Sequence, residues 1–290
     1  MGILKRTWGI VSPLIIFFLI QYMVSFAATF IFMSSAAGTN ILTDNAQAIA
    51  LTEAAYEMLN NNVVLMAGIA ALISIPIFNR MLGKEWLKRS YLIESREPKF
   101  YKYIFVAVMS AGLTVAVNLA INAFELFRYA TDYAQIAREM YAEPLYMQIL
   151  VIGILVPIAE ELMFRGVIYE RICAYGNETT GAILTSFLFG MYHGNMIQGM
   201  YAFVFSMLMI FAYKKTGSFF APVCFHIVSN LTGLVLNQLN PLSSMEYSIG
   251  IVLSAFIGLY GLYELKKGDF FKVIPLDLNP ETYETEEKEE

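Results

Sequence analysis

Long apolar segments recur along the whole chain and are separated by short polar stretches. A transmembrane helix needs about 20 mostly apolar residues, because the hydrocarbon core of a bilayer is about 30 Å thick and a helix rises about 1.5 Å per residue. The pattern therefore predicts an all-α fold, a polytopic transmembrane helix bundle of about eight spans. The apolar segments cover approximately residues 8–33, 63–78, 104–124, 146–169, 180–193, 196–213, 219–239 and 247–265.

The first apolar segment is the longest, and no charged residue lies between Arg6 and Asp44. The apolar region of a signal peptide has only about 7 to 15 residues. We therefore expect a retained first helix, with a cleaved signal before the small residues at 34–37 as the alternative. Between the fifth and sixth segments, Gly194 and Asn195 favour a tight turn or a break inside the membrane.

Composition supports a membrane protein, since hydrophobic residues make up 58% of the chain and charged residues 15%. Soluble domains are about 45 to 50% apolar and about 25% charged. The net charge is −5 and no basic stripe is interleaved with aromatic residues, which argues against a nucleic-acid partner. The two cysteines, Cys173 and Cys224, form no CxxC pair, and we interpret them as small apolar side chains.

The distribution of basic residues predicts the orientation, because Lys and Arg flanks stay in the cytoplasm. If the N-terminus is inside, sixteen of the 19 basic residues fall on the cytoplasmic side, and only Arg128 and Arg138 fall outside. We therefore expect a multi-pass protein of the plasma membrane with both termini in the cytoplasm. Residues 1–265 are expected to form a single transmembrane domain. Residues 266–290 are expected to form an acidic, disordered cytoplasmic tail.

Five ionisable residues lie within the predicted spans, and they include both histidines of the chain. A charge at the bilayer centre costs at least about 2.5 to 3.5 kcal/mol, so such residues persist mainly where they pair, line a cavity or function. Counting helical rise from the predicted helix ends places Glu160, His193, His226 and Asn230 in the middle or inner half of the bilayer. One polar site is therefore predicted from Glu160, Glu161, Arg165, His193 and His226.

Spacing within the fourth apolar segment suggests different roles for its two acids. Glu161 and Arg165 are four residues apart with the acid first, which is the favourable order for a helical ion pair. Glu160 points about 100° away from Glu161 and lacks that partner, as suits a general base. Pro157, one turn before Glu161, removes a backbone hydrogen bond and is expected to kink the helix beside the site.

Three further pairs repeat the four-residue interval. His226 and Asn230 share a helix face and present two donors that can stabilise an oxyanion. Phe189 precedes His193 by one turn and is expected to fix the imidazole and exclude water. Asn118 and Asn122 show the same interval, and we interpret them as hydrogen-bonding links between helices.

Three motifs follow from these residues: EExxxR, FxxxH and HxxxN, in this order on three apolar helices. In this arrangement the chain resembles the CPBP family, which comprises type 2 CAAX prenyl proteases and bacteriocin-processing (Abi) proteins, with the core at about residues 146–239. The resemblance implies an intramembrane endopeptidase. By the same resemblance, the catalytic residues would be Glu160 with His193, which activate water, and His226 with Asn230, which hold the oxyanion; the supporting residues would be Glu161, Arg165 and Phe189.

Cofactor and substrate are less determined. The family has been described both as metalloproteases and as metal-free glutamate-dependent hydrolases. Glu160, His193 and His226 could supply three zinc ligands, but HExxH is missing and a metal on Glu160 would leave only the paired Glu161 as a base. We expect no cofactor, with zinc as the alternative. The expected partners are the lipid bilayer and a membrane-anchored peptide or protein substrate, with no nucleic acid.

Two other functional classes fit parts of the pattern. A non-enzymatic immunity or scaffold protein of the same family would keep the helices without using the acid. A proton-coupled transporter would use Glu and His as a relay, but the inverted repeats typical of transporters are not evident in the sequence. Among hydrolase substrates, peptide or bacteriocin processing is favoured over maturation of prenylated proteins.

Overall fold

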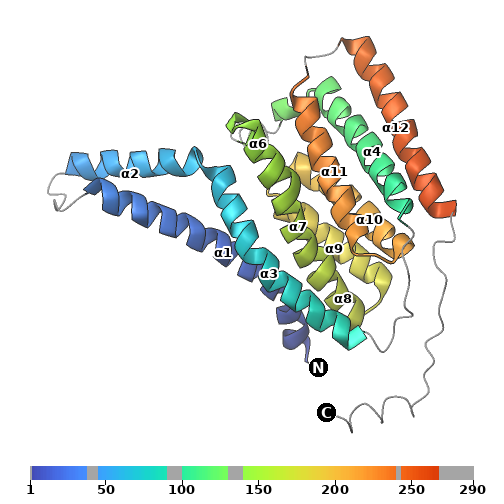
Figure 1. Ribbon diagram of the computed structural model, residues 1–290, viewed down its shortest axis with the longest axis horizontal. Helices are drawn as coiled ribbons and strands as arrows, with labels where there is room; N and C mark the ends of the chain where they lie inside the picture. Colours follow the sequence, from blue (N-terminus) through green and yellow to red (C-terminus); the bar gives the residue numbers. More distant parts are fainter. Residues whose placement is uncertain (1, 38–44, 90–99, 130–139, 240–242, 268–290) are drawn as a thin grey trace, which may run out of the picture.

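The computed structural model describes residues 2–37, 45–89, 100–129, 140–239 and 243–267, and all regular structure in these ranges is helical (Figure 1). This confirms the predicted all-α class. The elements are α1 (Ile3–Ala37), α2 (Asn45–Asn60), α3 (Val63–Arg89), α4 (Lys102–Ala123), η2 (Leu126–Tyr129), α6 (Leu145–Met147), η3 (Gln148–Leu155), α7 (Val156–Glu161), η4 (Leu162–Tyr169), α8 (Glu170–Tyr175), α9 (Glu178–Tyr192), α10 (Met196–Thr216), α11 (Phe220–Asn237) and α12 (Ser244–Lys267).

Seven helices in the described ranges are long and apolar enough to cross a membrane. They are α1, α3, α4, the continuous helix from α6 to α8, α10, α11 and α12. Large apolar side chains are exposed on the outside of the bundle, for example Phe18 on α1 and Phe256 on α12. The protein is therefore a multi-pass membrane protein, as the apolar pattern predicted.

The predicted fifth crossing, at residues 180–193, corresponds to α9 and is shorter than a full span. Its 15 residues extend for only about 22 Å at about 1.5 Å per residue. The helix ends because Gly194 adopts a left-handed φ of +71°, and Asn195 then caps α10 by accepting a hydrogen bond from the backbone N–H of Gln198 at 2.8 Å. The expected break at Gly194 and Asn195 is thus confirmed, and it places His193 at the end of a helix.

Helix α2 was not predicted. Its 16 residues mix alanine with polar side chains, so they do not form the uninterrupted apolar segment that predicts a transmembrane helix. In Figure 1, α1 and α2 extend away from the remaining helices, which lie side by side. Helices α4 and α12 pack closely, since a Cβ at Gly112 would collide with the backbone of Gly258. Small residues at such contacts let transmembrane helices approach each other.

The helix that carries both acids is irregular. It contains two π-helical segments, η3 and η4, which flank the α-helical segment α7. Segments of π-helix occur frequently at functional sites. Glu160 and Glu161 are the last two residues of α7.

The amino end of α1 and the carboxyl end of α12 lie on the same side of the bundle, where α3 and α8 also end (Figure 1). The side of the membrane on which the two termini lie stays a prediction. Of the predicted acidic tail, Lys266 and Lys267 form the end of α12. Residues 268–290 lie outside the described residues, so the prediction of disorder there stays a prediction.

Candidate active site

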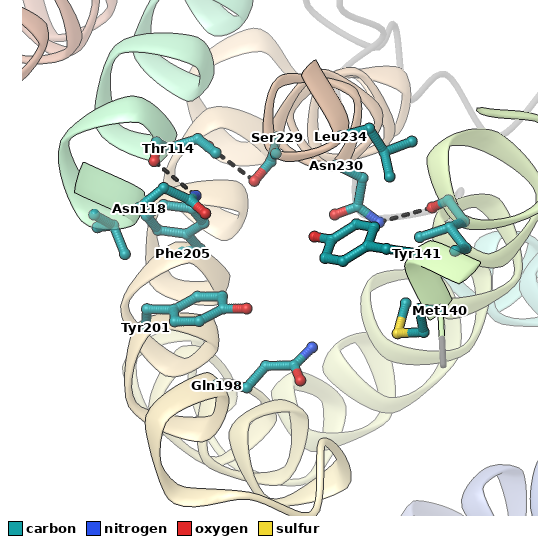
Figure 2. Close-up of a pocket in the computed structure, with 13 residues that line it drawn as sticks. Thr114, Asn118, Met140, Tyr141, Gln198, Tyr201, Phe205, Ser229, Asn230 and Leu234 are labelled. Atoms are coloured by element: carbon teal, nitrogen blue, oxygen red, sulfur yellow. Dashed lines mark hydrogen bonds between the residues drawn. The ribbon is translucent and has the colours of Figure 1, made fainter. Parts of the chain in front are cut away.

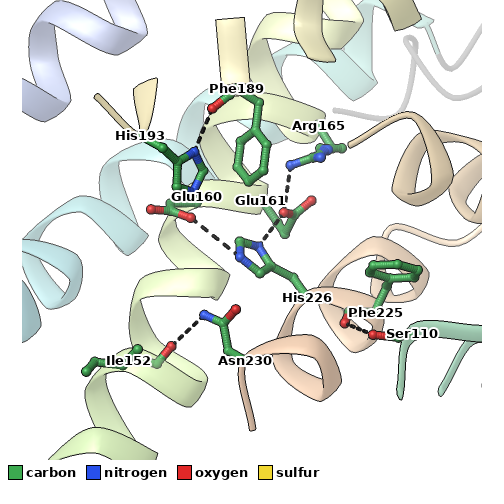
Figure 3. Close-up of polar contacts among 10 residues, drawn as sticks. All are labelled: Ser110, Ile152, Glu160, Glu161, Arg165, Phe189, His193, Phe225, His226 and Asn230. Atoms are coloured by element: carbon green, nitrogen blue, oxygen red, sulfur yellow. Dashed lines mark hydrogen bonds and ion pairs between the residues drawn. The ribbon is translucent and has the colours of Figure 1, made fainter. Parts of the chain in front are cut away.

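The centre of the predicted polar site is the fully buried carboxylate of Glu161. Its Oε1 accepts hydrogen bonds from Arg165 Nη1 and from His226 Nδ1, each at 2.7 Å (Figure 3). Glu161 and Arg165 both have no exposed surface, so the predicted ion pair is confirmed. The contact with His226 was not predicted, and it means that this pair also fixes an imidazole from α11.

Glu160 lies on the other side of the same imidazole. Its Oε2 is 3.7 Å from His226 Nε2, and only 5% of the residue is exposed. The carboxylate of Glu161 is ionised beside Arg165 and can only accept hydrogen bonds. The proton in the bond between Glu161 and His226 therefore resides on His226 Nδ1. The second nitrogen of His226, Nε2, therefore faces Glu160.

The charges of this cluster balance with one proton. Arg165 and Glu161 cancel, so Glu160 and His226 together must be neutral for the buried cluster to carry no net charge. Two arrangements satisfy this condition: a protonated Glu160 beside a neutral His226, or a carboxylate at Glu160 beside an imidazolium at His226. In both arrangements the two side chains share one proton.

His193 lies just after the end of α9, beside Glu160 (Figure 3). Its Nδ1 is 2.8 Å from the carbonyl oxygen of Phe189. A carbonyl oxygen only accepts, so Nδ1 is the donor, and the neutral ring keeps a free lone pair at Nε2. Within the described residues, His193 makes no ion pair with Glu160; the two side chains are neighbours without direct pairing.

Phe189 packs between the polar groups. Its ring lies 4.8 Å from the ring of His193 and 5.6 Å from that of His226, both edge-on. The guanidinium of Arg165 stacks over the same ring at 4.4 Å. Phe189 is 2% exposed, so it separates the ion pair from His193 and fills space that water would otherwise occupy, as expected from FxxxH.

Asn230 is bound to the backbone of the acid-bearing helix. Its Nδ2 donates to the carbonyl of Ile152 at 2.8 Å (Figure 3). At the end of η3, the N–H of Val156 bonds the carbonyl of Val151, five residues back. The next residue, Pro157, has no N–H to give to Ile152 in the same pattern. Asn230 therefore satisfies the carbonyl that Pro157 cannot, which leaves its second N–H and its Oδ1 for other partners.

Tyr192 was missed by the sequence reasoning. Its hydroxyl lies near the carboxylate of Glu160 and near Gln21 on α1. Its ring packs between Phe17 and Phe164 at centroid distances of 5.9 and 5.6 Å. Its position immediately before His193 was the available signal, but the FxxxH motif leaves that position unspecified.

A metal site was the alternative for Glu160, His193 and His226. Among the described residues, no three His, Cys, Asp or Glu side chains are arranged to hold a metal ion. The Nδ1 atoms of both histidines are already used, by Phe189 and by Glu161. As placed here, the three side chains do not form a ligand set.

Comparison with known proteins matches the region that contains this cluster. A family model described as "Type II CAAX prenyl endopeptidase Rce1-like" matches residues 142–232, and all seven motif residues lie in that range. The chain is 27% identical over 137 residues to a protein of Bacillus subtilis (strain 168) named "Putative membrane peptidase YdiL".

This match covers 47% of the present chain and 54% of the Bacillus protein, so the chain spans about half the length of the curated relative. No solved structure matches the chain. The family model and the three motifs, whose side chains meet in one buried cluster, agree with each other. The resemblance of this chain to the CPBP family of membrane proteases is thereby confirmed over residues 142–232.

Proposed function

We propose that the protein is an intramembrane endopeptidase that hydrolyses a peptide bond of a membrane-associated peptide or protein. The observation that carries the proposal is the position of Glu160, a buried acid without an ion-pair partner of fixed charge, between the imidazoles of His226 and His193. A general base must lie within reach of the proton that it removes. A water held at Glu160 meets that condition.

In the proposed reaction, the Glu160 carboxylate removes a proton from a water molecule while the water oxygen bonds to the peptide carbonyl carbon. The other O–H of the water donates a hydrogen bond to His193 Nε2, which orients the water oxygen. The protonated Glu160 then gives its proton to the amide nitrogen as the carbon–nitrogen bond breaks. The products are a carboxylic acid and an amine, and Glu160 returns to its starting form.

Charge balance in the cluster links the base to an oxyanion donor. When Glu160 is a carboxylate, the balancing proton resides on His226, whose Nε2–H can then donate to the developing oxyanion. The other proposed donor is the second N–H of the Asn230 side chain. Its first N–H already bonds the carbonyl of Ile152, which fixes the orientation of the amide. Thus the form of the site that contains the base is also the form that contains a charged donor.

The test uses the purified full-length chain in lipid nanodiscs and a set of membrane-anchored peptides, with turnover measured by mass spectrometry. Glu160→Gln should lower turnover by at least about 100-fold, because general base catalysis contributes about 10² to 10⁴. The matched control is Glu85→Gln, since Glu85 is also buried (6% exposed) but pairs with Arg171 outside the site. Equal turnover by wild type and Glu160→Gln, or equal losses in both variants, would refute the proposal.

The remaining proposals concern setting and cofactor. We place the protein in the plasma membrane with both termini in the cytoplasm, on the basis of its basic residues. Single cysteines at positions 5 and 267 should both react with an impermeant thiol reagent only from the cytoplasmic side, and labelling from opposite sides would contradict this.

We also propose metal-free hydrolysis. Within the family, processing of a peptide or bacteriocin precursor is the substrate class that we favour.

A further inference from the structure

A cavity of about 120 Å³, lined by both polar and apolar side chains, lies beside Asn230 of the candidate active site (Figure 2). Asn230 and Ile152, which hydrogen-bond to each other, line it. The cavity is therefore continuous with the group proposed to hold the oxyanion. Its described lining residues are Thr114, Val117, Asn118, Met140, Tyr141, Ile152, Gln198, Tyr201, Phe205, Ser229, Asn230, Gly233 and Leu234.

None of these described lining residues is charged, and amides and hydroxyls lie among the apolar side chains. Figure 2 shows Asn118, Gln198, Tyr201 and Asn230 directed toward one common space from three helices. The cavity lining thus combines amides and hydroxyls without a fixed charge. Such a lining suits a neutral polar ligand, because a charged ligand would be buried here without a counterion.

Several hydrogen-bonding atoms at this cavity have capacity left. Asn118 Nδ2 donates to its own helix at Thr114, and Gln198 Oε1 accepts from Asn195. Among the described residues, neither Asn118 Oδ1 nor Asn230 Oδ1 accepts a hydrogen bond, and Gln198 Nε2 donates none. Two amide oxygens and one amide nitrogen therefore have no hydrogen-bond partner among the described residues, and they can pair with the alternating N–H and C=O groups of a peptide backbone.

We infer that this cavity is a substrate subsite that binds a short, uncharged polar segment of the peptide next to the scissile bond. The inference rests on the proposed function and deepens it by naming a substrate class. Asn118 and Asn230 accept from backbone N–H groups of the segment, and Gln198 donates to a backbone carbonyl. At about 120 Å³, the cavity equals roughly the liquid volume of four water molecules, so it admits a small residue such as Gly, Ser, Ala or Asn.

The experiment measures binding separately from cleavage. The Glu160→Gln protein, full-length in nanodiscs, is titrated with fluorescent, acylated decapeptides made of Gly, Ser, Ala and Asn, in which one Asp or Lys is placed at each position in turn. A charge at one position, or at two adjacent positions, should weaken binding tenfold or more, and a charge elsewhere should have little effect. Equal effects of charge at all positions would overturn the inference.

Two variants connect the effect to the cavity. Asn118→Leu should weaken binding of the neutral peptide, whereas the control Asn122→Leu should not. Asn122 is exposed, lies one turn further along α4, and makes the same type of hydrogen bond to its own helix. Gln198→Glu keeps the oxygen that binds Asn195 and adds a charge, so it should restore binding of the peptide with Lys at the sensitive position. Equal binding by the two asparagine variants, or no restoration by Gln198→Glu, would contradict the subsite.

The outcomes also separate this inference from the proposed function. If the charge pattern is found but wild-type protein cleaves none of the peptides that bind, the subsite stands and the hydrolase proposal fails. If wild-type protein cleaves them in a Glu160-dependent way without any charge pattern, the hydrolase proposal stands and the subsite is wrong. A drop in turnover that is the same for all peptides in Asn118→Leu, with unchanged binding, would identify the cavity as a water store and refute the subsite.

Discussion

Replacing Arg165 with methionine tests how strongly the cluster depends on its buried charge balance. Both Arg165 and Glu161 are fully buried, and Glu161 Oε1 accepts two hydrogen bonds of 2.7 Å. In Arg165→Met, Glu161 keeps only His226 and becomes an uncompensated buried charge. Breaking a buried ion pair in this way costs about 3 to 5 kcal/mol, so we expect the free energy of unfolding to fall by about that amount.

The assay is reversible unfolding in mixed micelles, with Arg128→Met as the matched control. Arg128 pairs with Glu125 on the surface, where the two side chains are 65% and 48% exposed, and such pairs contribute about 0 to 1 kcal/mol. Glu161→Gln together with Arg165→Met should recover part of the loss, because no charge is then left unpaired. A loss in Arg165→Met no larger than in Arg128→Met would refute the account of the cluster.

Three further predictions concern individual groups. Asn230→Leu leaves the Ile152 carbonyl without its side-chain donor and should lower the free energy of unfolding by about 1 to 3 kcal/mol. An unchanged unfolding curve would contradict the account in which Asn230 replaces the backbone donor that Pro157 lacks. Tyr192→Phe keeps the ring contacts but removes the hydroxyl beside Glu160. Turnover should therefore fall up to about tenfold, the equivalent of one hydrogen bond to Glu160 formed during the reaction. Tyr260→Phe on the exposed face of α12 should match wild type. Chelator treatment should leave turnover unchanged, and a loss reversed by added zinc would disprove metal-free hydrolysis.

Much of the fold could be predicted because membrane helices are encoded by length and apolar content. The apolar segments gave the helices that cross the bundle, and both histidines were placed with Glu160 in the middle or inner half of the bilayer by counting helical rise. The bounds of α9 were predicted closely, but the segment was counted as a full crossing, whereas the turn at Gly194 and Asn195 ends it after 15 residues. Helix α2 was missed because its mixed composition carries no signal for a membrane span.

The contacts within the site were only partly predictable. The bond between Glu161 and Arg165 follows from spacing on one helix. The bond between Glu161 and His226, by contrast, depends on how α11 is rotated against α7. Similarly, the π-helical turns around Pro157 decide that Asn230 binds Ile152. Such rotations follow from packing of whole helices, which the pattern of a single segment does not specify.

The central claim is that Glu160 makes this chain a protease within the membrane. The most direct measurement is a comparison of peptide termini in membranes of cells that express wild type, Glu160→Gln or Glu85→Gln in place of the native chain. The account predicts a set of new termini, in or next to membrane segments, that is present with wild type and Glu85→Gln and missing with Glu160→Gln. Identical sets of termini in wild type and Glu160→Gln would contradict it.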